Sequence, residues 1–466
     1  MYSNHVLFRL FTILAVTLFT AIPPCHREFT ADRILDRIFP RAHHLKARHH
    51  VRRSSLVERT CPAPVTVVNQ ASDDGNVRNN NPPSPSPFLT PSKRLLSQSI
   101  YSKYKQTSDV YRPGVYPHLT DSSGAWVWEA ADWWTAGFYP GTLYLLHERS
   151  KLCPGSTNID WLQRGRQWSD EMIPLTERNA QGHDVGFMAY PFFHELNENP
   201  NNQTARQGID RFATTLAARY EESVGCTRSW DGSPPHFLVI MDNMMNLDLL
   251  FQAGSMFRRD NYAYIAQRHA NTTAAHHLRP DASSYHVVDY NQYTGEVMRQ
   301  YTAQGFADWS TWSRGQAWGT YGFTTMYLRT GDAHYLDTAR AMGQKWLDRL
   351  AEDPSGVPKW DFDAPEPTSR DTSAAAIIST AFLHIAQAET SKGNSTGAIY
   401  WKNNAIRVIS TTADQYLQES SSWEAILSDG TSNHPSNRYD TGIVYGDYYF
   451  VKAGNMMLEM GLIGCQ

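Results

Sequence analysis

The chain has few cysteines, and none of them are paired at the spacing that binds zinc. Its 466 residues contain five, at positions 25, 61, 153, 226 and 465. The sequence also lacks an HExxH motif, a glycine-rich phosphate loop and a Ser-His-Asp arrangement at a nucleophile elbow. We therefore predict no metal site and no cofactor. If a leader containing Cys25 is removed, four cysteines remain, and they allow two disulfides in any of three pairings.

Long hydrophobic runs are also missing. The longest one, 11–22, is too short to cross a bilayer, and we interpret residues 1–25 as a signal peptide, with a signal anchor as the alternative. We expect no stable membrane insertion after processing. Residues 26–91 form a basic leader and then a linker rich in Pro, Asn and Ser, which cannot bury a core and is expected to be disordered. The catalytic domain is predicted to span 92–466.

A basic patch with interleaved aromatics is absent from this domain, which argues against nucleic acid as a partner. The sequons at Asn202, Asn271 and Asn394, together with the leader, favour a secreted glycoprotein. A signal-anchored or intracellular protein is the alternative, and the oligomeric state stays open. The chain is rich in Trp (14) and Tyr (24), whose amphipathic rings suit both a core and a carbohydrate cleft.

The domain alternates between two kinds of segment, which predicts an all-α fold. Six charged segments carry apolar residues at spacings of three and four, as helices with one buried face do. They cover 92–106, 160–173, 204–222, 259–276, 333–351 and 398–418. Six apolar segments begin near Trp134, Asp184, Asn243, Arg314, Thr372 and Asp447. Six outer and six inner helices predict an (α/α)6 barrel, with an α-solenoid as the alternative. We find no sustained strand pattern.

Acids and aromatics gather where the apolar segments begin, and in a toroid these starts converge on one mouth. Trp134 suggests a stacking wall, and His183 precedes Asp184. Asp242 lies among bulky apolar neighbours, which favour the protonated carboxyl that a general acid needs. The competing interpretation for Asp184 and Asp242 is a helix N-cap.

The stretch that leads into the fourth apolar segment is the longest and contains Gln304, Trp312, Arg314 and Trp318. An arginine flanked by two tryptophans in an uncharged segment is held by stacking, and its partner is either an acidic ligand or a structural aspartate. Asp371 and Asp447 open the last two segments and are expected to form caps or ion pairs. Two carboxylates in an aromatic cleft indicate sugar chemistry.

Several motifs in one order carry a resemblance to a known family. They read WWTAGFYPG, HDVGF, MDNMMNL, QGFADWSTWSRGQAWGTYGF, WDFDAP with RDTSAAAI, and GDYYF. Over roughly residues 95–462 the chain resembles glycoside hydrolase family 88, the unsaturated glucuronyl hydrolases. The resemblance implies an (α/α)6 barrel and an oligosaccharide substrate that ends in a 4-deoxy-4,5-unsaturated uronic acid. Protonation of C4 and addition of water at C5 give a hemiketal, which opens and expels the remaining sugar, unlike ordinary glycoside hydrolysis.

The resemblance also implies residue roles. Asp242 is expected to donate the proton to C4 and to act as the base for water, with Asp184 as the second essential acid. The substrate-binding residues that it implies are His183, His286, Gln304 and Arg314, with Trp134, Trp312 and Trp318 as aromatic walls. The alternatives are an unsaturated rhamnogalacturonyl hydrolase, a sugar epimerase or lyase, and a sugar-binding protein on the same fold.

Overall fold

The computed structural model describes residues 89–177 and 181–465, and the interpretations of 1–25 and of 26–88 fall outside this range. Ser92, where we place the domain start, caps the short 3-10 helix η3 (Lys93–Leu96). In the described residues the α-helices are α3 (Gln98–Asp109), α4 (Phe138–Leu152), α5 (Trp161–Asp170), α6 (Val185–Met188), α7 (Tyr190–Glu198), α8 (Gln203–Ala217), α9 (Leu247–Phe257), α10 (Asp260–His276), α11 (Ser313–Thr330), α12 (Ala333–Ala351), α13 (Thr372–Ser391), α14 (Ser395–Tyr416) and α15 (Val444–Glu459).

The charged segments form the outer helices α3, α5, α8, α10, α12 and α14. In α12 the buried residues follow the predicted spacing of three and four: Tyr335, Leu336, Ala339, Met342, Gly343, Trp346, Leu347 and Leu350. Each outer helix therefore buries one stripe and leaves its other face to solvent.

The apolar segments form the inner helices, and these are buried on all sides. In α13 every residue from Thr372 to Leu383 is buried, which covers more than three turns. The second inner segment is divided into α6 and α7, and the third begins as the 3-10 helix η5 (Met241–Asn246) before continuing as α9. None of the helices in 89–177 and 181–465 has both the length and the apolar character needed to cross a membrane.

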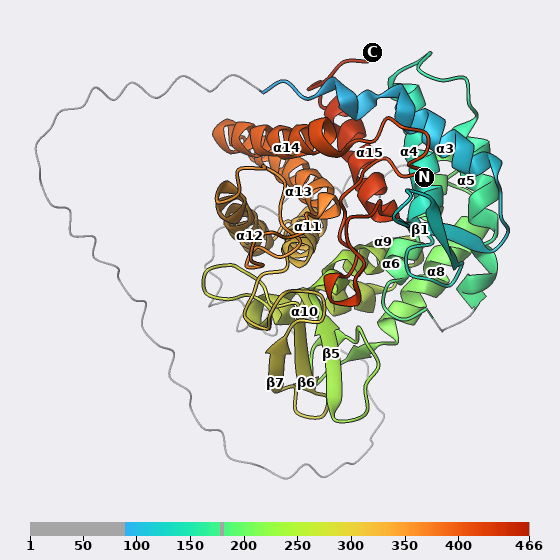
Figure 1. Cartoon of the computed structure of the whole chain (residues 1–466). Coiled ribbons are helices and arrows are strands. Elements are labelled where there is room, and N and C mark those ends of the chain that lie inside the picture. Colours follow the sequence, from blue (N-terminus) through green and yellow to red (C-terminus); the bar gives the residue numbers. More distant parts are fainter. Residues whose placement is uncertain (1–88, 178–180, 466) are drawn as a thin grey trace, which may run out of the picture. The chain divides into compact units, whose positions relative to one another are not determined.

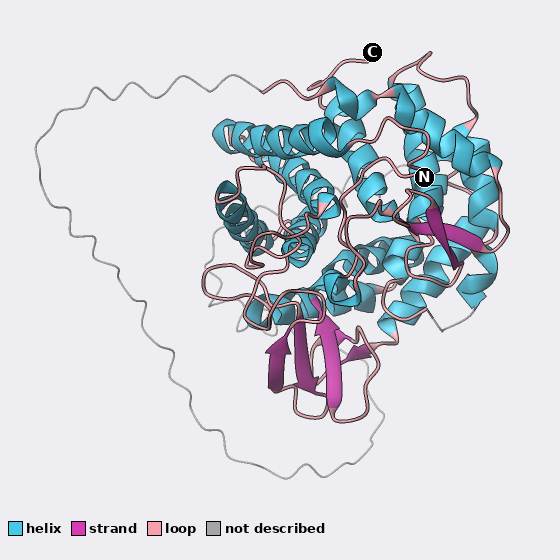
Figure 2. Cartoon of the chain, viewed as in Figure 1, coloured by secondary structure: helices cyan, strands magenta, loops and turns pink. Residues whose placement is uncertain are grey.

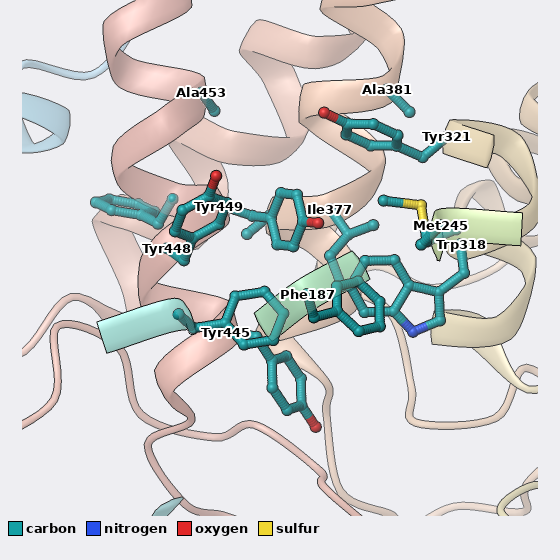
Figure 3. Packing of buried hydrophobic residues seen from close by; sticks show 14 of the residues in the cluster. Phe187, Met245, Trp318, Tyr321, Ile377, Ala381, Tyr445, Tyr448, Tyr449 and Ala453 are labelled. Carbon is teal, nitrogen blue, oxygen red and sulfur yellow. The ribbon is translucent and has the colours of Figure 1, made fainter. Parts of the chain in front are cut away.

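The inner helices form a closed ring. Contacts run from α4 to α7, from α6 to α9, and then through α11, α13 and α15 back to α4 (Figure 1). Tyr449 from α15 meets Trp318 and Tyr321 from α11 inside this ring (Figure 3). The prediction of an (α/α)6 barrel is confirmed.

A disulfide between Cys153 and Cys465, with Cα atoms 5.5 Å apart, ties the end of α4 to the segment after α15. It is one of the pairings that the sequence left open. Cys226 is a free buried thiol, and Cys61 lies outside the described residues.

The sequence shows no sustained strand pattern, yet the described residues include short strands beside the helical ring. A hairpin of β1 (Val115–Thr120) and β2 (Trp126–Ala130) precedes α4. A two-residue pair joins β3 (Tyr220–Glu221) and β4 (Cys226–Thr227). An antiparallel sheet pairs β5 (His236–Ile240), β6 (Val287–Asn291) and β7 (Val297–Tyr301) (Figure 2). Two reasons explain why the sequence did not reveal these strands. The periodicity of a short apolar run such as 236–240 does not distinguish a strand from a buried helix. In addition, β5 and its partner β6 are separated in the chain by α9 and α10.

Candidate active site

The starts of the inner helices surround one cavity of about 300 Å³. Five of the residues predicted for the site line it: Trp134, Asp184, Asp242, Gln304 and Arg314. They come from the starts of the first four inner segments, so four of the six starts that were expected to converge on one mouth meet at this cavity.

Asp242 lies in the first turn of η5 and is 8% exposed. The N-cap interpretation is wrong for this residue, because Ile240 occupies the cap position and η5 has no side-chain cap. Among the described residues, no donor reaches Asp242 Oδ2 within hydrogen-bonding geometry, and His286 Nε2 lies 3.5 Å away. A buried carboxyl oxygen without a donor is costly in a purely structural role, which favours a group that meets a ligand.

Asp184 occupies the N-cap position of α6 but makes no side-chain cap bond. Its Oδ1 instead lies 3.3 Å from Nε2 of His183. Burial raises the pKa of Asp184 above its ordinary value; His183 opposes this shift, and the charge of Asp242 adds to it. Asp184 therefore retains its proton more strongly than an isolated aspartate would.

A hydrogen bond from a backbone N–H to a side-chain amide holds the two acidic segments together. Gly186 N donates to Asn246 Oδ1 at 2.8 Å, so the segment after Asp184 is bonded to the turn that contains Asp242. A Cβ at Gly186 would lie 2.5 Å from that oxygen and 2.8 Å from Asn246 Cα. Glycine is therefore required for this close approach.

Arg314 has a structural partner. Its Nη1 pairs with Asp371 Oδ2 and also donates to a backbone carbonyl, while its Nη2 donates to Gln304 Oε1 at 3.0 Å and to Ser432 O at 2.7 Å. The guanidinium lies 4.6 Å from the ring centre of Trp312. Of the two partners left open by the sequence, the structural aspartate is the one observed. Asp371 also caps α13, as expected, by accepting from Ser373 N and Ala374 N.

His286 precedes β6 and is 4% exposed. Its Nδ1 accepts the backbone N–H of Ala303 at 3.2 Å, which assigns the proton of the neutral ring to Nε2, on the side of Asp242. The ring also contacts Trp312, with 4.6 Å between ring centres. The family-based expectation that His286 lies at the site therefore agrees with its position, although the strand that holds it was not predicted.

Trp318 does not form a wall of this cavity, and that expectation is corrected. It is 1% exposed and packs against Phe187, Tyr445 and Tyr449 in the ring of inner helices (Figure 3). Four residues after Arg314, it lies one helical turn further along the same face of α11 and so contributes to the core. Trp312, 3% exposed, is likewise covered, because Arg314 and His286 lie against its ring.

Trp133, the neighbour of Trp134 in the predicted stacking wall, also lines the cavity, and further lining residues come from strands and loops for which no role was predicted: His118, Trp230, Asn433 and Arg438. His118 in β1 is 2% exposed, and its Nε2 has no hydrogen-bond partner in the described residues. Burial lowers the pKa of His118 to about 4, and the charge of Arg438 acts in the same direction, so the ring is neutral at physiological pH. The adjacent tryptophans in 132–134 were a signal for Trp133, whereas the polar loop 432–440 gave none for Arg438.

Asp447 differs from the expected cap. It lies inside the first turn of α15, fully buried, and accepts from Ile426 N at 2.8 Å and Leu427 N at 3.2 Å. Burial raises the pKa of Asp447 to about 7. Within 89–177 and 181–465, no three His, Cys, Asp or Glu side chains gather as a metal site would require.

Comparison with known proteins identifies the group to which this geometry belongs. No protein-family model matches the chain. The chain is 39% identical over 328 residues to the unsaturated glucuronyl hydrolase of Formosa agariphila, covering 69% of this chain and 78% of that protein. It is 32% identical over 363 residues to the unsaturated glucuronyl hydrolase of Bacillus sp. strain GL1, covering 75% and 92%. The crystal structure of an unsaturated glucuronyl hydrolase specific for heparin superimposes with a TM-score of 0.71 at 28% identity, covering 80% of this chain and 99% of that one. The chain belongs to the unsaturated glucuronyl hydrolase family.

Proposed function

We propose that this protein, as a member of glycoside hydrolase family 88, removes a 4-deoxy-4,5-unsaturated uronic acid from the non-reducing end of lyase-generated oligosaccharides. One observation carries the proposal: Asp184 and Asp242 meet at a single cavity, and the Gly186–Asn246 bond joins the segments that contain them. The buried Oδ2 of Asp242, which has no hydrogen-bond partner in the part of the chain that the structure describes, is available to a substrate.

In the proposed reaction Asp242 gives its proton to C4, and the C4=C5 electron pair forms the new C4–H bond. Water then adds to C5 and returns a proton to the Asp242 carboxylate. The resulting hemiketal opens to a ketone at C5, which leaves a hydroxyl on C1. That hemiacetal releases the remaining sugar as an alcohol, so the glycosidic bond breaks without direct protonation of its oxygen.

The neighbouring groups support these two proton transfers. Burial and the nearby Asp242 raise the pKa of Asp184, which keeps a proton at this cavity before the substrate arrives. His286, with its Nε2 proton facing Asp242, is placed to orient the attacking water. Arg314 is saturated by protein partners, so we assign it to holding Gln304 at the cavity wall. Arg438 lines the cavity and forms no ion pair with another described residue, so it is the cation offered to a substrate anion.

The decisive experiment follows the ultraviolet absorbance of the C4=C5–carboxylate chromophore in a panel of lyase-generated disaccharides, including glucuronyl and galacturonyl types. The wild type should bleach the signal, and Asp242→Asn should reduce the rate by several orders of magnitude with an unchanged circular dichroism spectrum. Asp248→Asn is the matched control, since this acid lies six residues further on and pairs with Arg329 instead.

A folded Asp242→Asn protein with a near-normal rate would refute the assignment of the acid. A steady signal with every substrate would favour a sugar epimerase or a binding protein. Bleaching limited to rhamnogalacturonan-derived substrates would identify the rhamnogalacturonyl activity.

We also propose that the protein is exported and glycosylated. The support is the Cys153–Cys465 disulfide, which persists in oxidising compartments, and the sequons at Asn202, Asn271 and Asn394. Of these asparagines, Asn202 caps α8 and Asn394 caps α14 through their side-chain oxygens. A mass shift on treatment with peptide N-glycosidase would support export; free thiols at both cysteines in protein isolated under alkylation would count against it.

A further inference from the structure

Two aromatic side chains project into solvent from the loop 302–311, which joins β7 to α11. Phe306 is 45% exposed and Trp309 is 65% exposed, and their ring centres lie 6.3 Å apart at 88°. Leaving such rings in water forgoes the free energy that burial would provide. An exposed, paired arrangement at the edge of a site is typical of a surface that meets a ligand.

The loop is a built structure rather than a loose connection. Its central anchor is Asp361, which is fully buried and whose Oδ2 accepts from Phe306 N at 2.9 Å and from Ser310 Oγ at 2.7 Å. At its base, Asp308 accepts from Thr302 N at 3.1 Å and pairs with Arg299 at 2.8 Å. The backbone beneath both rings is therefore held in place before any ligand arrives, which lowers the ordering cost of binding.

The same loop also forms part of the cavity. Ala303 N donates to His286, and Gln304 lines the cavity and accepts from Arg314. Phe306 follows Gln304 by two residues, so their Cα atoms are at most about 7 Å apart. The aromatic pair thus lies on the same loop as a residue of the cavity wall, within a short length of chain.

We propose that Phe306 and Trp309 form a platform for the sugar units that follow the first two, on the reducing side of the chain, so that oligosaccharides longer than a disaccharide are bound more tightly. This inference rests on the proposed function. The unsaturated end occupies the cavity, and the rest of the chain leaves past Gln304. Sugar rings present C–H faces that stack on aromatic rings, and the charges of Arg299 and Asp308 at the base of this loop pair with each other at 2.8 Å.

The test compares unsaturated disaccharide and tetrasaccharide prepared by lyase from the same unsulfated chondroitin. The wild type, Trp309→Ala and Phe306→Ala are assayed by loss of absorbance, and the affinity of each for both lengths is measured by titration calorimetry on an Asp242→Asn background. Tyr293→Ala is the matched control, because this aromatic is 69% exposed but lies on the turn at the end of β6 remote from His286.

We expect Trp309→Ala to raise KM and Kd for the tetrasaccharide by about 3- to 10-fold, as loss of one aromatic contact predicts, and to leave both values for the disaccharide unchanged. Tyr293→Ala should alter neither. Equal effects of Trp309→Ala on the two lengths, or a wild type that binds the tetrasaccharide no more tightly than the disaccharide, would overturn the platform. Absence of turnover by the wild type would instead overturn the proposed function, and the calorimetric comparison would still decide on the platform.

Discussion

Asp371 has two roles that can be separated by substitution. Its Oδ1 accepts from Ser373 N at 3.0 Å and Ala374 N at 3.3 Å and so caps α13, while its Oδ2 pairs with the buried guanidinium of Arg314. Asn keeps the cap, because Asn and Asp serve equally well at this position, but it removes the charge. Ala removes both.

The structure sets the expected size of each loss. In Asp371→Asn the 2% exposed Arg314 keeps only neutral acceptors, from Gln304 and two backbone carbonyls. Removing one partner of a buried ion pair costs about 3–5 kcal/mol. Asp371→Ala also loses the cap, which adds about 1 kcal/mol.

Urea unfolding followed by tryptophan fluorescence measures both variants. Asp160→Asn is the control, since Asp160 caps α5 by accepting from Gln163 N at 2.9 Å and forms no ion pair within the described residues. It should change the free energy of unfolding by less than about 0.5 kcal/mol. If Asp371→Asn lies within about 1 kcal/mol of the wild type, the ion pair does not stabilise Arg314 as argued, and the cavity wall is held by the carbonyls alone.

Three further predictions concern other parts of the barrel. Gly186→Ala should lower the free energy of unfolding by about 1–3 kcal/mol, since its Cβ would overlap Asn246. It should also lower kcat by separating the two acidic segments, and an unchanged kcat in the absorbance assay would contradict this. The pKa of Asp447 is about 7 in the fold, against an ordinary value of 3.8, so the fold binds this proton more tightly than the unfolded chain. Its contribution to stability should be complete below about pH 4 and be lost as the pH rises through 7, and urea midpoints across this range should vary less in Asp447→Asn. Cys465→Ser should lower the free energy of unfolding by about 2–5 kcal/mol, because it opens a loop of 312 residues, and it should leave kcat unchanged. Equal thermal midpoints for the wild type and the variant would show that the disulfide does not constrain the unfolded chain.

Composition and periodicity are sufficient to predict the helical ring. Whether a helix is inner or outer depends on which of its faces are apolar, and this is a local property of each segment, as α12 and α13 show. The pairing of strands in the sheet, by contrast, is not decided within any one segment. β5 pairs with β6 across α9 and α10, so its register depends on where two helices end in space.

The same distinction applies to the site. Asp184, Asp242 and Arg314 lie at helix starts, and a toroid brings such starts together whatever the details of packing. His118 and Arg438 come from a strand and a polar loop, whose side chains reach the cavity only because of tertiary contacts. The assignment of Trp318 to the cavity wall was wrong because the residue is close to Arg314 in the sequence but lies in the next turn of α11. That turn is buried in the core, whereas the turn with Arg314 faces the cavity.

Closure of the ring by α4 and α15 has a consequence for synthesis. Buried Arg149 of α4 donates to Val451 O and to Asn455 of α15, contacts that join positions about 300 residues apart. Until α15 has left the ribosome, α4 lacks this partner, and the apolar sides of α4 and α13 remain open to solvent or to chaperones. The barrel therefore completes its core after translation of residues 444–459, and a nascent chain halted before them would present an unfinished, aggregation-prone edge.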